Sequence, residues 1–229
     1  MSGLILLLLL CNLTFICCRD SSLTLQDDMR PRGVKFQSLD YRNILYWKHP
    51  TSHQIFQYSV QYKVYGDKHW TDAKHCQSIS ISQCDLSQET SDPREWYYAR
   101  VQSTSEAGQS PWVISARFHP QAESNFSPPQ LKLNGTERGI VVRVKPPRTP
   151  YRRQNGTRIS VLKLQKLIFR IYVMHNEVEE EIHEMESCTK ELLIQGLRPK
   201  TTYCLQAQTV IPRFGRTSSK GLKTCVTTL

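Results

Sequence analysis

The sequence has no helical periodicity of useful length and, after its first residues, no apolar run long enough to cross a bilayer. It has no nucleophile motif, no phosphate-binding glycine loop and no paired carboxylates placed for acid–base catalysis. No Cys-x-x-Cys pair is present, which argues against a zinc ribbon. These absences argue against a helical bundle and an enzyme, and they predict a chain with no catalytic residue, metal or cofactor.

The chain opens MSGLILLLLLCNLTFICCRD, where Leu4 to Cys18 carry no charge. This run is too short to span a membrane comfortably and fits the apolar core of a secretory signal peptide. We expect cleavage near Cys18 and a secreted, extracellular protein; a membrane-anchored N-terminus is the alternative. Three sequons agree with export and predict N-glycosylation. They begin at Asn125, Asn134 and Asn155, and Pro128 is expected to hinder glycosylation of the first.

The net charge of +10 is unevenly distributed. Residues 1–124 contain 12 basic and 12 acidic side chains, whereas residues 125–229 contain 18 and 8. From Arg138 to Arg170 there are ten basic residues and no acidic one. Such a field attracts an acidic partner or a polyanion, for which a heparan-type polysaccharide is the extracellular candidate. Nucleic acid is not expected for an exported chain, and a merely solubilising basic face is the alternative.

Apolar and polar residues alternate over 56–65, which predicts a strand with one buried face. Other runs rich in β-branched and aromatic residues predict strands at 43–47, 97–104, 140–145 and 167–175. Many short strands indicate β-sandwiches, and the mature length suits two sandwiches of about 100 residues each. The polar, proline-containing stretch 119–130 predicts their boundary. The expected division is a leader at 1–18 and modules at 30–124 and 125–229, with Pro128–Pro129 stiffening the junction.

Residues 197–209, LRPKTTYCLQAQT, have the pattern of a tyrosine corner. In such a corner, Tyr203 at the start of a strand hydrogen-bonds to backbone a few residues upstream. Leu197 would fill the core at the crossover and Pro199 would set the turn. We interpret this motif as a device for stability.

Leu-x-Pro-x-Thr-x-Tyr resembles a fibronectin type III module, and two such modules with few cysteines resemble the extracellular part of a type II cytokine receptor. The stretches 34–47, 60–70, 76–92 and 97–103 are similar to the receptors of this family that bind interleukin-22. No WSxWS element of type I receptors appears. The resemblance implies an all-β fold of two tandem fibronectin type III-like β-sandwich domains.

The same resemblance implies a decoy function, because no membrane span follows the second module. The chain would bind interleukin-22, or a close cytokine of the interleukin-10 family, and keep it from its signalling receptor. Alternatives are the ectodomain or a splice form of a signalling receptor, and a matrix-bound module that uses its basic face. A hydrolase or metal site around His175 and His183 is a remote alternative, because HExxH is absent and the nearby glutamates suit a solvated edge.

In the resembled family, Cys76 would pair with Cys84 and Cys204 with Cys225. Cys188 is then left over and departs from the family pattern. We expect a buried thiol there first, with an intermolecular bridge or a reactive thiol as alternatives.

Tyr65 falls on the wet side of the 56–65 alternation, directly before Gly66. An exposed tyrosine beside a loop is a typical hot spot, although packing of Tyr65 on Trp70 is the alternative. The resemblance implies that this loop contacts the cytokine. Its expected contact residues are Lys63, Tyr65, Gly66 and Asp67.

Further contacts are expected in loops that would meet at one corner of the molecule. In the first module these are 87–93, where a simple loop is the alternative, and 105–112. In the second they are 150–163, which departs from the family by carrying Leu162 and Lys163 before a strand, and 210–216, where Phe214 would be an exposed anchor. The remaining predicted contacts are Thr90, Ser91, Asp92, Gly108, Gln109, Lys163, Arg213 and Phe214, whereas Trp47, Tyr98 and Trp112 are expected in the core or an aromatic ladder.

Overall fold

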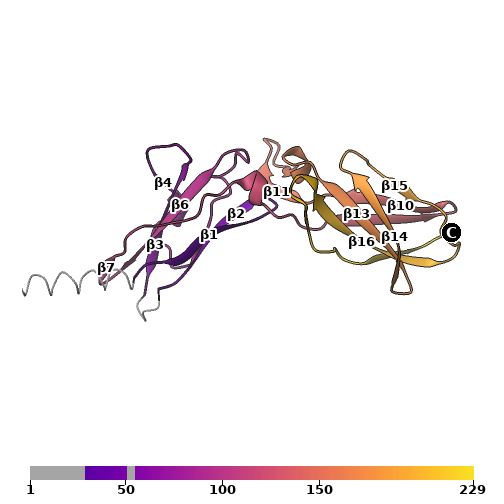
Figure 1. Ribbon diagram of the computed structural model, residues 1–229, viewed down its shortest axis with the longest axis horizontal. Coiled ribbons are helices and arrows are strands. Elements are labelled where there is room, and N and C mark those ends of the chain that lie inside the picture. Colours follow the sequence, from indigo (N-terminus) through magenta and orange to yellow (C-terminus); the bar gives the residue numbers. More distant parts are fainter. Residues whose placement is uncertain (1–28, 51–54) are drawn as a thin grey trace, which may run out of the picture. The chain divides into compact units, whose positions relative to one another are not determined.

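The structure, a computed structural model, describes residues 29–50 and 55–229, which form two compact units of short strands (Figure 1). The first unit comprises the described part of Met1–Gln37 with Ile44–Glu89 and Glu95–Phe118. The second comprises Ser38–Asn43, Thr90–Arg94 and His119–Leu229. The expected leader at 1–18 lies outside the described residues. Within the described ranges, no helix is long and apolar enough to cross a membrane.

Two antiparallel sheets make up the first unit. One has the strand order β1-β2-β5, and the other has the order β4-β3-β6-β7, with β8 also paired to β6. The strands are β1 Arg32–Leu39, β2 Arg42–Lys48, β3 Gln57–Val64, β4 Thr71–Asp72, β5 Gln83–Asp85, β6 Tyr97–Ser105, β7 Gly108–Gln109 and β8 Val113–Ile114, and the 3₁₀ turn η1 spans Lys74–Cys76.

The core of the first unit follows the predicted alternation. Tyr58 and Val60 of β3 are fully buried, and Val60 lies opposite Val101 of β6. Leu45 and Trp47 of β2 pack into the same core, so the interpretation of Trp47 as a core residue is confirmed. Period-two patterning therefore identified the buried face of these strands before any tertiary information.

The second unit contains two larger sheets and one separate hairpin. The sheet orders are β15-β10-β9 and β14-β13-β16-β17, with β18 paired to β16, and the hairpin is β11-β12. The strands are β9 Gln130–Thr136, β10 Gly139–Lys145, β11 Arg148–Arg152, β12 Arg158–Ser160, β13 Ile168–His175, β14 Val178–Glu186, β15 Leu192–Ile194, β16 Thr202–Ile211, β17 Arg216–Thr217 and β18 Thr224–Thr227. Short helical turns are α2 Pro120–Glu123, η2 Val161–Lys163 and η3 Pro212–Phe214. The all-β class and all five predicted strands are confirmed.

The tyrosine corner is present at the start of β16. The Tyr203 hydroxyl accepts a hydrogen bond of 3.1 Å from the backbone N–H of Arg198, and Tyr203 is 1% exposed. Leu197 packs on the sheet core beside it. The bond ties the crossover to the strand, as the motif predicts.

A second apolar cluster lies in the same unit, and we call it the loop core. It comprises Tyr41, Phe126, Tyr151, Val161, Leu167 and Ile211. Tyr41 reaches it from the two-residue turn between β1 and β2, where Asp40 and Tyr41 have φ of +54° and +65°. Such a turn favours Asn-Gly, so a tyrosine there is strained, and its burial offsets the strain.

Asp40 fastens the same turn. Its carboxylate accepts hydrogen bonds from the N–H (2.9 Å) and the hydroxyl (2.6 Å) of Ser127. Burial nevertheless raises the pKa of Asp40, while these two hydrogen bonds act in the opposite direction. The turn is therefore held by both packing and polar contacts.

The stretch 119–130 contains α2, a helical turn that the sequence analysis did not predict. The His119 ring accepts a hydrogen bond of 3.0 Å from the N–H of Ala122, and Pro120 occupies the first helical position. An N-cap followed by proline favours a helix start, but one turn is too short to show periodicity.

The cysteine pairs implied by the family resemblance, Cys76–Cys84 and Cys204–Cys225, are both present. Cys204 and Cys225 lie directly opposite each other on β16 and β18. Cys188 is free and exposed, so the expectation of a buried thiol is wrong. It occupies the turn after β14, where no second layer covers it.

Replacing Tyr203 by Phe should lower the free energy of unfolding of the second unit by about 1 kcal/mol, because the N–H of Arg198 loses its acceptor. Tyr41→Phe is the matched control. Its buried hydroxyl has no hydrogen-bond partner among the described residues, so its removal should be neutral or stabilising. Urea unfolding followed by circular dichroism measures both. Equal losses in the two variants would contradict the role of the corner.

Removing each disulfide should destabilise its own unit according to the loop that it closes. The double alanine variant of Cys204 and Cys225 should lose about 3.4 kcal/mol, and that of Cys76 and Cys84 about 2.6 kcal/mol. The same unfolding measurement, with two resolved transitions, assigns each loss to a unit. A larger loss for the shorter loop would contradict the chain-entropy account.

Candidate binding surfaces

The predicted tyrosine–glycine turn directly follows β3 in the first unit. The Tyr65 side chain is 57% exposed, and its N–H donates a 2.7 Å hydrogen bond to the carbonyl of Trp96. Gly66 has φ +96°, which a residue with a side chain would adopt only with strain. The Lys63 ammonium donates to the carbonyl of Asp67 at 3.1 Å. The turn is thus closed on itself and presents Tyr65 outward.

An arginine and a second aromatic ring accompany Tyr65. The guanidinium carbon of Arg117 lies 4.1 Å from the ring centre of Trp96 and 5.4 Å from that of Tyr65. Trp96 is 36% exposed, and the Tyr98 ring centre lies 6.3 Å from that of Tyr65. Stacked arginine restrains aromatic rings and supplies positive charge, which suits a contact surface. We call Tyr65, Trp96 and Arg117 the tyrosine surface.

Sequence reasoning missed Trp96 and Arg117. Their proximity follows from the bridge between Tyr97 and Phe118, the residues that come after them. Trp96 also stands directly before a predicted strand, and that position is the one available signal.

Trp70 does not pack on Tyr65. It instead lies under Lys63 (5.1 Å) and Arg100 (4.4 Å), and Arg100 also stacks on Trp112 at 4.5 Å. This stack matches the expected ladder role of Trp112. Tyr65 is therefore exposed, as expected from its position on the solvent side of the 56–65 alternation.

In the second unit, residues from two predicted loops meet around an open hollow of about 510 Å³. Ser91 and Asp92 contribute from one loop and Lys163 from the end of η2. The hollow also includes residues that the sequence analysis did not select, namely Pro93, Arg94, Gln121 and Leu164. We call this set the hollow surface.

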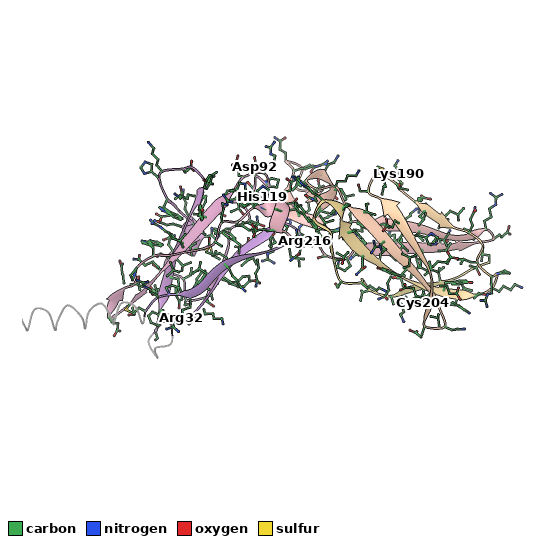
Figure 2. All side chains as sticks on the ribbon, in the orientation of Figure 1. Arg32, Asp92, His119, Lys190, Cys204 and Arg216 are labelled. Atoms are coloured by element: carbon green, nitrogen blue, oxygen red, sulfur yellow. A yellow bond between two sulfur atoms is a disulfide. The ribbon has the colours of Figure 1, made fainter. Side chains whose placement is uncertain are left out.

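Polar contacts fix the walls of the hollow surface. The Asp92 carboxylate accepts two side-chain hydrogen bonds from Arg94, of 3.1 and 3.0 Å (Asp92 is labelled in Figure 2). These bonds lower the pKa of Asp92, so the carboxylate is ionised at neutral pH. The N–H of Gln121 donates to the carbonyl of Pro93 at 3.0 Å, and its side chain donates to that of Leu164 at 3.4 Å. The surface carries both signs of charge in fixed positions.

Thr90, a predicted contact residue, is completely buried. Its hydroxyl accepts a 2.7 Å hydrogen bond from the side chain of Asn43. The expectation that Thr90 contacts a partner is therefore wrong. The Thr90 hydroxyl and the Asn43 side-chain amide are both buried and satisfy each other. The local sequence does not reveal this pairing.

Gly108 and Gln109 are exposed, but they lie at the end of the sheet opposite to the turn that carries Tyr65. Val64 pairs with Tyr97 at the start of β6, whereas Gly108 pairs with Ser105 at its end. Eight residues of strand separate the two ends by about 26 Å. Figure 1 shows β7 at the end of β6 remote from β4. The expectation that this loop shares a corner with Tyr65 is wrong.

Phe214 is half-buried and packs on the loop core, so the prediction of an exposed anchor is wrong. The guanidinium carbons of Arg213 and Arg216 each lie 5.5 Å from its ring centre. Arg213 remains exposed. Arg216, labelled in Figure 2, donates to the carbonyls of Ala122 and Ser124 and therefore anchors α2.

All three sequon asparagines are exposed. Asn134 lies on β9, and Asn155 lies at the tip of the β11-β12 hairpin. The side-chain oxygen of Asn125 accepts a 3.2 Å hydrogen bond from Arg216. This contact adds to the expected hindrance at Asn125.

The described residues show one metal-like cluster, of His75, Cys76 and Cys84. Both of its cysteines are joined in a disulfide, so neither offers a thiolate. His175 and His183 do not converge, because His183 lies opposite Ile171, four residues along β13 from His175. The histidine alternative therefore lacks a site in the described part of the chain.

Comparison with known proteins indicates the family to which this chain belongs. A model of the tissue factor family matches residues 4–112, and one of the interferon-alpha/beta receptor fibronectin type III family matches residues 124–229. Interleukin-22 receptor subunit alpha-2 of Rattus norvegicus is 34% identical over 86% of this chain and 87% of its own length. Interleukin-22 receptor subunit alpha-1 of Bos taurus is 35% identical over 81% of this chain and 32% of its own length.

A solved chicken interferon gamma receptor alpha chain superposes with a TM-score of 0.66. The alignment covers 86% of this chain and 97% of that one at 22% identity, which supports the fold. These relatives are receptors rather than enzymes, and the two family models between them match both sandwiches described above. The chain therefore belongs to the type II cytokine receptor family.

Proposed function

We propose that this chain is a secreted receptor that captures interleukin-22, or a close cytokine of the interleukin-10 family, and withholds it from a signalling receptor. Its relatives carry the name of interleukin-22 receptor subunits. The observation that carries the proposal is the tyrosine surface, where a closed turn presents Tyr65 beside Arg117 and Trp96. Secretion after a leader at 1–18, with modules at 30–124 and 125–229, is part of the proposal.

Capture requires no chemistry, only surfaces that are already in their bound shape. Binding proteins lose affinity when side chains must be ordered on association, at about 0.5–1.5 kcal/mol for each flexible side chain. Stacking by Arg117 and the backbone bond to Trp96 restrain Tyr65 in advance. In the second unit, Arg94 restrains Asp92 in the same way.

None of the proposed contact residues is buried; Lys63 and Asp92 are half-buried and the others are exposed. The first unit contributes Lys63, Tyr65, Gly66 and Asp67, with Trp96 and Arg117 added by the structure. The second contributes Ser91, Asp92, Lys163 and Arg213. Fixed charges of both signs favour selection among related cytokines, because an unmatched charge at an interface is costly.

Tyr65→Ala should weaken binding of interleukin-22 by more than about 2 kcal/mol, because a central tyrosine is a typical hot spot. Biolayer interferometry of the secreted protein measures the affinity. Ile81→Ala is the matched control, since Ile81 is 56% exposed in the same unit but outside the predicted loops. Unchanged thermal unfolding should accompany the loss. Equal affinity of the two variants, or no binding by folded wild type, would refute the site or the ligand respectively.

Occlusion predicts competition. Wild type added in excess should prevent interleukin-22 from binding an immobilised extracellular part of interleukin-22 receptor subunit alpha-1, and Tyr65→Ala should need a higher concentration to do so. Sequential loading on a biosensor tests this directly. A stable ternary complex would contradict the withholding role and favour a chain that assembles with other receptor subunits.

A further inference from the structure

The β11-β12 hairpin, Arg148–Arg152 and Arg158–Ser160, carries four arginines that none of the contacts above employs. Arg148, Arg152, Arg153 and Arg158 are all exposed. Arg152 and Arg158 lie directly opposite each other in the register. Like charges directly opposite on paired strands are destabilising. The hairpin thus concentrates positive charge at a cost to its own stability.

Two other arginines of the stretch 138–170 have acidic partners, whereas the hairpin arginines have none among the described residues. Arg143 pairs with Glu191 and Arg170 with Glu184, each at 2.8 Å. The ion pairs within the described residues include none of the four hairpin arginines. Arg152 donates instead to the carbonyl of Gly156 at 2.7 Å. The local field is therefore uncompensated.

The inner side of the hairpin is firmly anchored. Tyr151 packs into the loop core, and its hydroxyl donates to the carbonyl of Tyr41 at 3.4 Å. The Thr149 hydroxyl, fully buried, donates to the carbonyl of Ile159 and accepts from the N–H of Tyr151. At the tip, the N–H of Gly156 donates to the carbonyl of Arg153. The arginines consequently extend from a fixed backbone rather than from a loose loop.

We propose that this hairpin binds a sulfated linear polysaccharide of the glycosaminoglycan class. The guanidinium presents a planar fork of donors that matches the oxygens of sulfate, and it stays charged at all physiological pH values. A polymer with regularly spaced sulfates can contact several of these arginines at once, which a single small anion cannot. The unpaired charge and the anchored backbone together favour such a ligand.

This inference goes beyond cytokine capture and assigns the hairpin a separate task. Attachment to an extracellular polysaccharide would hold the receptor near cell surfaces and raise its local concentration there. The hairpin arginines are not among the proposed cytokine contacts, and the tyrosine surface belongs to the other unit. Capture and attachment should therefore be separable by mutation.

The test uses the secreted full chain and heparin as the probe. The triple variant Arg148→Gln, Arg152→Gln, Arg158→Gln leaves the Asn155 sequon intact. It should weaken heparin binding at least tenfold at physiological salt. Counterion release predicts that the slope of log affinity against log salt falls by about 2 to 3 when three contacts are lost. Arg32→Gln, Lys35→Gln, Lys74→Gln is the matched control, because it removes the same charge from exposed positions of the first unit.

Several outcomes would overturn the proposal. An equal loss in both triple variants would show attraction by net charge alone. Retained heparin binding with lost interleukin-22 binding would make the hairpin part of the cytokine contact instead. Thermal unfolding checks that the hairpin variant folds, and Arg152→Gln alone, with a smaller loss expected in the same direction, replaces it if it does not. Undiminished heparin binding by a folded hairpin variant also excludes the site.

Discussion

The loop core is the packing interaction on which the presented surfaces of the second unit depend. Six large apolar side chains meet there, and each contributes roughly 1.5–3 kcal/mol when buried. This gain exceeds the strain of about 1–3 kcal/mol expected for an unfavourable residue in the β1–β2 turn. Tyr41 enters the core from the β1–β2 turn, Tyr151 from β11 and Val161 from η2. Because these segments are held by one cluster, they are ordered before any ligand arrives.

Regular features of the fold were readable in the sequence because they repeat locally. The alternation at 56–65 predicts β3, its buried face and the exposure of Tyr65. The corner motif at 197–203 predicts the hydrogen bond between the Tyr203 hydroxyl and upstream backbone. Both depend on neighbours within a few residues. The hollow surface was partly predicted, since Ser91, Asp92 and Lys163 do meet there.

Errors arose where distant residues decide the outcome. Thr90 is buried with its hydroxyl accepting a hydrogen bond from the side-chain amide of Asn43, which is distant in sequence. Phe214 is half-buried because it packs on the loop core. The prediction places Gly108 at the wrong end of the sheet, because the sequence alone does not fix the direction in which β6 runs. The stretch that forms the β11-β12 hairpin is predicted as a loop, because one of its two buried residues in β11, Thr149, is polar and Pro150 interrupts the strand pattern. These wrong predictions depend on tertiary contacts, which periodicity and turn chemistry do not encode.

Hydrogen–deuterium exchange of the chain with and without interleukin-22 tests preformed capture most directly. The account predicts slower exchange at the amides of 64–68 and 91–94 in the complex. Amides of β7 and of the exposed edge strand β14 should exchange at unchanged rates. Those of the loop core should already be protected in the free chain, because that cluster is complete without a ligand. Protection confined to β14 or β7, or a loop core that becomes protected only on binding, would contradict it.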